Sequence, residues 1–261
     1  MFGFATLATG PTLAYRDVGA GLPVLLGHGF MLDSSLFAAQ TEELANRNRI
    51  ITCDARGHGG TRGGGSSFTQ WENARDILAL MDALGIERAV LGGHSQGGYT
   101  ALAASLLAPS RILGLVLIGT TSGPQDPASL PMLEEFAAAW AREGPTDELC
   151  QMLGDMVFGG TQAQQWHSVW QARRPDSFMP PFRAVVQRED LTPRLSEITA
   201  PTLIVHGEAD ASVPVEEARK LGGRLSATRS VVTVADAPHA VCATHSHATN
   251  QAIRTFLAEL S

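Results

Sequence analysis

The sequence predicts an α/β fold in which a mostly parallel sheet carries helices on both faces. Short apolar runs alternate with segments of helical periodicity along most of the chain, which is the pattern of strand–helix–strand crossovers. The apolar runs are continuous, as in strands that are covered on both faces. With 44% hydrophobic and 17% charged residues among 261, the chain can fill one large core, and α/β domains of this length are often undivided.

The first sixty residues are predicted to be mostly strands. A turn at Thr9-Gly10-Pro11 separates two short extended segments and favours an antiparallel hairpin. Residues 23–27 and 49–53 are continuous apolar runs and predict buried strands. Between them, residues 34–44 carry apolar side chains at helical spacing, which predicts a helix that connects the two strands.

The alternation continues after residue 69. Thr69 followed by Glu72 is a capping box that predicts a helix start, and Gly85 is a suitable residue to end that helix. The later expected elements are strands at 88–91, 112–118, 202–206 and 230–234, and helices at 96–107, 214–221 and 248–260.

The interval 124–197 does not fit this alternation. It contains no convincing strand, and its helical stretches are expected at 133–140, 148–156 and 162–173. We interpret it as a helical cap inserted after the strand at 112–118. Residues 1–123 and 198–261 would then form one α/β core that is interrupted once, and the cap would be too small to count as an independent domain.

Charge and composition exclude several function classes. The chain has 19 Lys+Arg against 26 Asp+Glu, a formal net charge of −7, and no basic stripe, which argues against nucleic acid and anionic membranes as partners. The three cysteines form neither a disulfide framework nor a CxxC pair. The N-terminus lacks the features of a signal peptide, and no apolar run reaches the length of a membrane span. We therefore expect a soluble cytoplasmic protein without a cofactor or metal.

Gly93-His94-Ser95-Gln96-Gly97 matches the G-x-S-x-G pattern of a nucleophile elbow. An apolar strand is expected directly before it and a helix directly after it, which is the context that the mechanism needs. A nucleophile at so sharp a turn crowds the positions two before and two after it, and here both are glycines. We expect the turn to lift the Ser95 hydroxyl clear of the sheet, at the positive end of the following helix.

A serine hydroxyl needs a general base to take its proton, and the base needs an acid that orients it. His239 follows the last predicted strand and Asp210 follows the strand before it, so both lie at the edge of the sheet where the elbow lies. The chain order Ser95, Asp210, His239 is the order expected for this elbow. Alternatives remain open: His245 and His247 for the base, Glu208 and Asp236 for the acid, and a metal site formed by Cys242, His245 and His247.

Acyl transfer also needs two N–H donors that stabilise the developing oxyanion. One is the backbone N–H of Gln96, which follows the nucleophile. The other is expected in the loop after the strand at 23–27, where the backbone N–H of Phe30 is the candidate. His28 and His94 lie beside these positions, and a buried histidine bonded to the main chain is at least as reasonable for each as a chemical role.

These residues together resemble the α/β-hydrolase superfamily over nearly the whole chain. Besides the elbow, His28-Gly29-Phe30 resembles its oxyanion segment, 54–59 (DARGHG) resembles its D-x-R-G-H-G loop, and 206–210 (HGEAD) resembles its H-G-x-x-D acid segment. The first half is most similar to the capped group of enol-lactonases, small esterases, C–C bond hydrolases and haloperoxidases. The resemblance implies an eight-stranded sheet with one antiparallel strand near the N-terminus and a cap after the sixth strand.

Two departures from the family pattern bear on function. Pro238 precedes His239 where this family usually has glycine, which loosens the local match without moving the base. Serine at the elbow argues against epoxide hydrolases and haloalkane dehalogenases, which place aspartate there.

We therefore expect a serine hydrolase that cleaves a carboxylic ester or lactone through an acyl-enzyme. Alternatives on the same scaffold are a C–C bond hydrolase, a thioesterase, a perhydrolase or haloperoxidase, a cofactor-free oxygenase, and a small-molecule receptor without turnover. Tryptophans in the cap predict an apolar or aromatic substrate that contacts Trp140, Trp166 and Trp170, although these indoles can equally form the cap's own core. We expect a small-molecule substrate and a monomer or homodimer.

Overall fold

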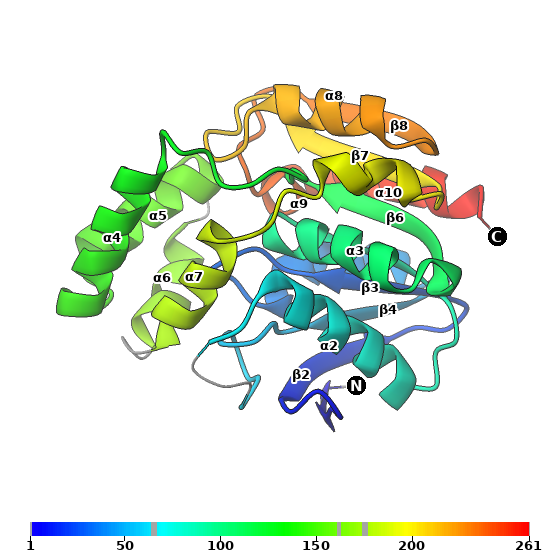
Figure 1. Cartoon of the computed structure of the whole chain (residues 1–261), viewed down its shortest axis with the longest axis horizontal. Coiled ribbons are helices and arrows are strands. Elements are labelled where there is room, and N and C mark those ends of the chain that lie inside the picture. The colour runs from blue at the N-terminus through cyan, green and yellow to red at the C-terminus, as the bar shows by residue number, and fades with distance from the viewer. Residues whose placement is uncertain (1, 64–66, 161–162, 174–176, 261) are drawn as a thin grey trace.

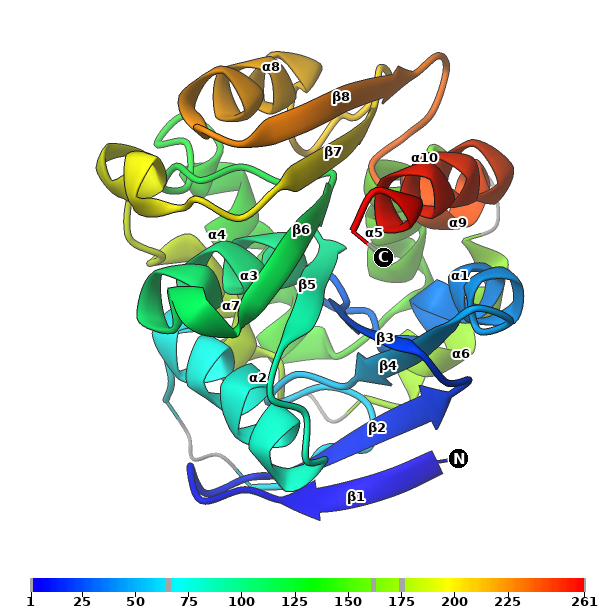
Figure 2. The ribbon, with the colours of Figure 1, turned by 90° about the vertical axis from the view of Figure 1, so that its right-hand side faces the viewer.

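One eight-stranded sheet organises the chain in the computed structural model, which describes residues 2–63, 67–160, 163–173 and 177–260. Its strands are β1 (Phe2–Thr6), β2 (Thr12–Val18), β3 (Leu22–Gly27), β4 (Asn48–Cys53), β5 (Ala89–His94), β6 (Ile112–Ile118), β7 (Thr202–Gly207) and β8 (Thr228–Val234). Their order in the sheet is β1-β2-β4-β3-β5-β6-β7-β8. Only β2 runs antiparallel to its neighbours, so the predicted mostly parallel sheet with one reversed strand is confirmed (Figure 2).

Helices cover both faces of this sheet. They are α1 (Ala38–Leu44), α2 (Gln70–Ala83), α3 (Gln96–Leu107), α8 (Val215–Arg224), α9 (Val241–Thr244) and α10 (Ser246–Ala258). Side chains of α2, α3 and α8 form one apolar cluster with the sheet, and those of α1, α9 and α10 belong to a second cluster. The strands therefore lie between two apolar layers, which explains their continuous hydrophobic runs.

Most predicted boundaries agree with the observed ones, and the differences have local causes. The capping box of Thr69 with Glu72 is present, and Gly85 after α2 adopts a φ of 65°, as a helix-ending glycine does. The segment predicted as one helix at 34–44 is a 3-10 turn, η1 (Ser34–Phe37), followed by α1, because Asp33 caps a separate first turn. The short helix α9 was not predicted.

The described residues between β6 and β7 form four α-helices, α4 (Leu130–Glu143), α5 (Asp147–Phe158), α6 (Gln164–Gln171) and α7 (Met179–Val186), which we propose to be the inserted cap. They lie together at one end of the molecule (Figure 1). The sequence did not predict α7, because Pro180 and Pro181 suggest a helix break; in the first turn of a helix proline is compatible with the backbone. Gln162, the first residue of the third predicted cap helix, lies outside the described residues.

The last part of the predicted cap packs with the core. Leu191, Leu195 and Ile198, in and around the 3-10 segment η4 (Thr192–Glu197), belong to the apolar cluster of α2, α3 and α8. We therefore propose that the cap ends near residue 190, earlier than 197. Among the described residues, no helix is long and apolar enough to cross a membrane.

The backbones of β3, β5 and α3 touch where three glycines meet. A Cβ on Gly97 would lie 1.9 Å from the Gly27 carbonyl oxygen, and a Cβ on Gly93 would lie 2.3 Å from the same atom. Real atoms do not approach so closely, so neither position accepts a side chain without movement of the strand or the helix. This contact fixes where α3 begins relative to β3.

We predict that Gly97→Ala destabilises the protein by about 3 kcal/mol or more, because the added methyl group would collide with backbone. Denaturant unfolding measures the effect. The matched control is Gly223→Ala in α8, where an added Cβ meets no atom within 4 Å and which should be neutral or slightly stabilising. Equal stability changes in the two variants would contradict the close contact.

Candidate active site

Ser95 occupies a sharp turn between β5 and α3. Its φ of 52° and ψ of −113° lie in a region that non-glycine residues rarely adopt. The turn is held by hydrogen bonds: the Ser95 N–H donates to the Ile118 carbonyl over 2.8 Å, and the Ser95 carbonyl accepts from the Thr120 hydroxyl over 2.7 Å. Ser95 is also the N-cap of α3, so its side chain lies at the positive end of that helix.

A cavity of about 420 Å³ opens between this turn and the cap. Core residues that line it include Phe30, Ser95, Gln96 and His239, so four of the residues predicted from the sequence border one space. The cap contributes a mainly apolar wall formed by Met132, Leu133, Leu153, Met156, Val157 and Val185. A small organic molecule could therefore contact Ser95 while its apolar part packs against the cap.

Asp210 is bonded to His239. The Asp210 Oδ2 atom lies 2.7 Å from His239 Nδ1, and its Oδ1 atom accepts hydrogen bonds from the N–H groups of Ser212 and Val213, each over 2.8 Å. His206 Nε2 lies 3.2 Å from the same Oδ2 atom. Burial by itself would raise the pKa of the Asp210 carboxyl, but the His239 charge and these hydrogen bonds bring that pKa well below its ordinary value. Asp210 is therefore a carboxylate that accepts from His239.

The competing acids lie elsewhere. Glu208 accepts a hydrogen bond from the Thr233 hydroxyl over 2.7 Å, and Asp236 is an exposed residue of a turn with a φ of 56°. In the described part of the chain, neither has a hydrogen bond to His239.

His245, an alternative for the base, is bonded to the Thr244 hydroxyl beside it, over 3.0 Å.

The alternative metal site has no support in the geometry. Cys242 is fully buried, and burial raises the pKa of its thiol to about 12, which disfavours the thiolate that a metal needs. Among the described residues, no three His, Cys, Asp or Glu side chains are grouped so that they could hold a metal ion.

The two predicted oxyanion donors lie at the same end of the sheet. Gln96 is the first residue of α3, where a backbone N–H has no acceptor within the helix. In the described structure the N–H of Phe30 also has no acceptor, whereas the next N–H, of Met31, donates to His58 Nε2 over 3.1 Å. The Met31 bond fixes the peptide that follows Phe30 and leaves the Phe30 N–H free for a ligand.

Three buried histidines stabilise this backbone. His28 accepts from the Ala55 N–H over 3.0 Å, and its Nδ1 donates to the Gly29 carbonyl over 2.7 Å. His94 Nε2 donates to the His239 carbonyl over 3.0 Å, and the two imidazole rings are 4.4 Å apart. Burial lowers the pKa of His28, and lowers those of His58 and His94 further, so all three are neutral at pH 7. Their role is to hold main-chain groups.

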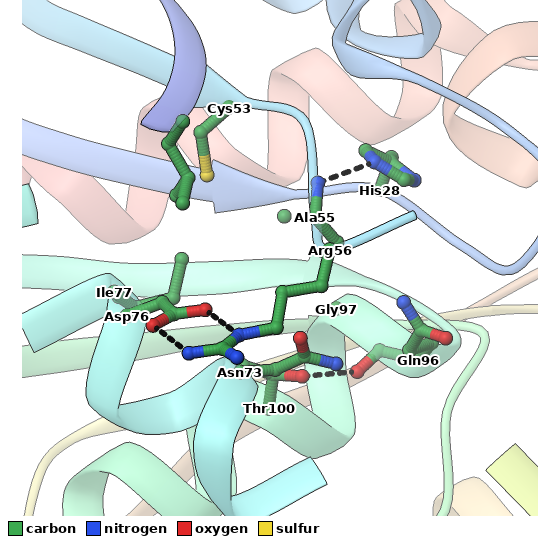
Figure 3. A pocket seen from close by; sticks show the side chains of 12 residues that line it. His28, Cys53, Ala55, Arg56, Asn73, Asp76, Ile77, Gln96, Gly97 and Thr100 are labelled. Carbon is green, nitrogen blue, oxygen red and sulfur yellow. Dashed lines mark hydrogen bonds and ion pairs between the residues drawn. The ribbon is translucent and has the colours of Figure 1, made fainter. Parts of the chain in front are cut away.

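A second, much smaller cavity of about 20 Å³ is lined by residues that include His28, Arg56, Gln96 and Gly97. Figure 3 shows the residues around it. Beside it the Arg56 guanidinium forms a buried ion pair with Asp76, with Nη2 at 2.9 Å from Oδ1. The same stretch of backbone is bonded to His28 through Ala55. This cavity has room for about one water molecule, and the candidate catalytic residues Ser95 and His239 do not line it. Arg56 therefore anchors the loop at 54–60 to α2.

The cap tryptophans do not line the large cavity. Trp140, Trp166 and Trp170 are at most 4% exposed and pack in the same apolar cluster as one face of the sheet. The indole N–H of Trp170 donates to the Met31 carbonyl over 2.8 Å. The expectation that these residues contact substrate therefore finds no support in their placement: they form the interior of the cap.

Many residues of the cavity wall were not singled out from the sequence, among them Tyr99, Thr120 and Arg188. Tyr99 lies four residues after Ser95 on α3, and that spacing alone places it on the side of the helix that carries the nucleophile. Thr120 and Arg188 carry no comparable signal, because their positions depend on how the loops at the two ends of the cap fold.

Comparisons with known proteins agree with this architecture. Residues 23–246 match the family model described as alpha/beta hydrolase fold. A thermophilic esterase from Thermogutta terrifontis, solved with malate bound, is 29% identical, with a TM-score of 0.90 over 100% of this chain and 99% of that chain. The enol-lactonase from Burkholderia xenovorans LB400 has the same fold, with a TM-score of 0.89 at 24% identity over 98% of this chain and 100% of that one.

A curated relative is the non-heme haloperoxidase of Rhodococcus erythropolis, which is 27% identical over 276 residues, covering 97% of this chain and 98% of its own length. The likeness to enol-lactonases and small esterases that the motifs suggested is thereby confirmed. The reactions of these proteins differ, so the comparisons leave the substrate of this chain open.

We predict that the stability contributed by ionised Asp210 is lost in acid. Its pKa is lower in the folded protein than its ordinary value of 3.8, so this contribution is complete above that value and falls as the pH drops towards the folded-state pKa. Asp210→Asn should cost about 2 kcal/mol near neutral pH and less near pH 3. Urea unfolding of both proteins across this range measures the difference, and a gap that widens in acid would contradict the assignment.

Proposed function

Since the chain belongs to the α/β-hydrolase fold family, we propose that it is a serine hydrolase that cleaves a carboxylic ester or lactone through an acyl-enzyme on Ser95. One observation carries the proposal. Ser95 stands in a sharp turn at the start of α3, and it borders the same cavity as His239, whose Nδ1 atom is bonded to the Asp210 carboxylate over 2.7 Å. In this proposal these three residues would serve as nucleophile, base and orienting acid.

In the proposed mechanism Nε2 of His239 takes the proton of the Ser95 hydroxyl while the serine oxygen attacks the substrate carbonyl. The bond from Asp210 keeps the proton of neutral His239 on Nδ1, so Nε2 is the free acceptor, and the carboxylate stabilises the imidazolium that forms. The N–H groups of Phe30 and Gln96 would bind the oxyanion. The imidazolium protonates the leaving alcohol, and His239 then activates a water molecule that releases the acid.

The proposed substrate is a small molecule with an apolar portion. The apolar part of the cap side of the cavity is formed by aliphatic side chains and the flexible thioethers of Met132 and Met156, which adapt to different apolar shapes. These methionines replace the three tryptophans as the candidate contacts of the substrate body.

We also propose that the enzyme works in the reducing cytoplasm as a monomer or homodimer. All three cysteines, Cys53, Cys150 and Cys242, are free and buried. Thiols enclosed in this way are common in proteins of reducing compartments, where disulfides rarely persist.

We predict that Ser95→Ala and His239→Ala each reduce turnover of p-nitrophenyl butyrate by about 10⁴-fold or more, and that the double variant is no worse than the single ones, because the two groups act as a unit. Asp210→Asn should also lower kcat strongly, since the histidine tautomer would no longer be fixed. Glu208→Gln is the matched control and should retain activity, because Glu208 has no bond to His239. Steady-state kinetics and circular dichroism of the four single variants measure activity and folding.

Labelling with a fluorophosphonate identifies the nucleophile directly. The expected result is a single adduct on Ser95 in the folded protein, absent in Ser95→Ala. No adduct on Ser95 would exclude the proposed mechanism. Activity on a panel of substrates then separates the alternatives. Lactones test lactone cleavage, thioesters test the thioesterase alternative, vinylogous 1,5-diketones test C–C hydrolysis, and an assay for peracid formation tests the perhydrolase alternative. Tight ligand binding with no turnover of any panel member would instead support a receptor.

A further inference from the structure

A positive charge borders the proposed substrate cavity. Arg188 follows α7, where the chain leaves the cap, and it lines the same cavity as Ser95. Its guanidinium carbon lies 6.0 Å from the centre of the Tyr99 ring. Tyr99 stands on α3 four residues after Ser95, with its N–H bonded to the Ser95 carbonyl over 3.1 Å. The cation is therefore placed beside the residue that lies roughly one helical turn from the nucleophile.

Within the described residues, the hydrogen-bond partners of this guanidinium are neutral. Nε donates to the Gly123 carbonyl over 2.9 Å, Nη1 donates to Gln125 Oε1 over 3.0 Å, and longer bonds of 3.2 Å reach the carbonyls of Val185 and Pro124. These bonds use four of the five N–H donors of an arginine, so one N–H on Nη2 remains for a ligand. In the described part of the chain, Arg188 forms no ion pair with a carboxylate.

The carboxylates that also border the cavity, those of Glu217 and Asp126, have hydrogen-bond partners other than Arg188. Glu217 is paired with Lys220 over 2.7 Å and accepts from the Thr121 hydroxyl. Asp126 is exposed and accepts from the Ala128 N–H over 3.0 Å. Neither of them therefore neutralises Arg188. By contrast, Arg56, the buried arginine beside the elbow, contacts both carboxylate oxygens of Asp76.

A partly buried cation without a counter-charge is unfavourable, because it has lost water and gained only neutral carbonyl dipoles. Burial accordingly lowers the pKa of Arg188, although the group stays charged at neutral pH. An anion that enters the cavity would supply the missing charge and accept the remaining N–H in a charge-assisted hydrogen bond.

We propose that Arg188 is a specificity residue that binds a carboxylate of the substrate, so that the preferred ester or lactone carries a negative charge some distance from its scissile carbonyl. The chemical class is a half-ester of a dicarboxylic acid, or an ester whose leaving group bears a carboxylate. This inference rests on the proposed hydrolase function and adds a substrate class to it.

The test compares substrates that differ only in charge. One pair is p-nitrophenyl hydrogen glutarate and its methyl ester, which place the carboxylate in the acyl part; the other is 3-carboxyphenyl butyrate and its methyl ester, which place it in the leaving group. We expect wild-type kcat/KM to favour the anionic member of at least one pair by about 10- to 100-fold. Arg188→Gln, which keeps a side-chain N–H donor for the neighbouring carbonyls, should remove this preference, and Arg188→Lys should retain part of it.

Arg183→Gln is the matched control. It removes the same charge from α7 at an exposed position that does not line the cavity, so the preference should remain at its wild-type value. No preference for the anion in either wild-type pair would overturn the proposal, as would equal preferences in Arg188→Gln and Arg183→Gln. If Arg188→Gln does not fold, wild type and Arg188→Lys still decide the question. Failure of the hydrolase proposal gives a different result, because neither neutral ester would then be cleaved and Ser95 would take no fluorophosphonate.

Discussion

The close contact of three glycine backbones is the constraint on which the rest of the site depends. Gly27 at the end of β3 touches Gly93 and Gly97 on either side of Ser95, with no room for a side chain at the last two positions. Because α3 can start so near β3, the N–H of Gln96 and the loop that carries Phe30 come to the same edge of the sheet. The relative position of the candidate oxyanion donors thus depends on a direct contact between main-chain segments, which are stiffer than long side chains.

On the polar side of the site, the main chain is held in place by hydrogen bonds from buried side chains. His58 fixes the peptide after Phe30, and His94 binds the carbonyl of His239. A neutral imidazole can donate through one nitrogen and accept through the other, and His58 in this way joins the Met31 N–H and the Arg56 carbonyl without the cost of a buried charge. Asp210 is the exception, since it stays ionised where burial opposes it, and hydrogen bonds from Ser212, Val213 and His239 offset that opposition.

The sequence predicts a feature well when residues close to it in the chain determine it, and poorly when the feature depends on contacts between distant residues. The bounds of α3 and β6 agree with those expected, because each is set by neighbouring residues, and the ends of parallel strands necessarily bring Ser95, Asp210 and His239 to one edge. No comparable local rule determines how the cap helices pack. Which apolar side chains face the cavity depends on packing, so indoles and thioethers could not be told apart in advance. Arg188 is bonded to residues 63 to 65 positions away, a contact with no local signature.

The cap is bonded to the loops that carry Phe30 and His239, the candidate oxyanion donor and the candidate base. Trp170 donates to the Met31 carbonyl, directly after Phe30, and the Ala240 N–H, directly after His239, donates to the Val157 carbonyl over 2.8 Å. The cap interior also shares one apolar cluster with the sheet. A rigid displacement of the cap would therefore break bonds beside a candidate oxyanion donor and beside the candidate base. The cap thus borders the candidate substrate cavity through α4, α5 and α7, and through α5 and α6 it is bonded to the loops of the candidate catalytic residues, so substrate selection and positioning of the candidate reacting groups are not separable in this fold.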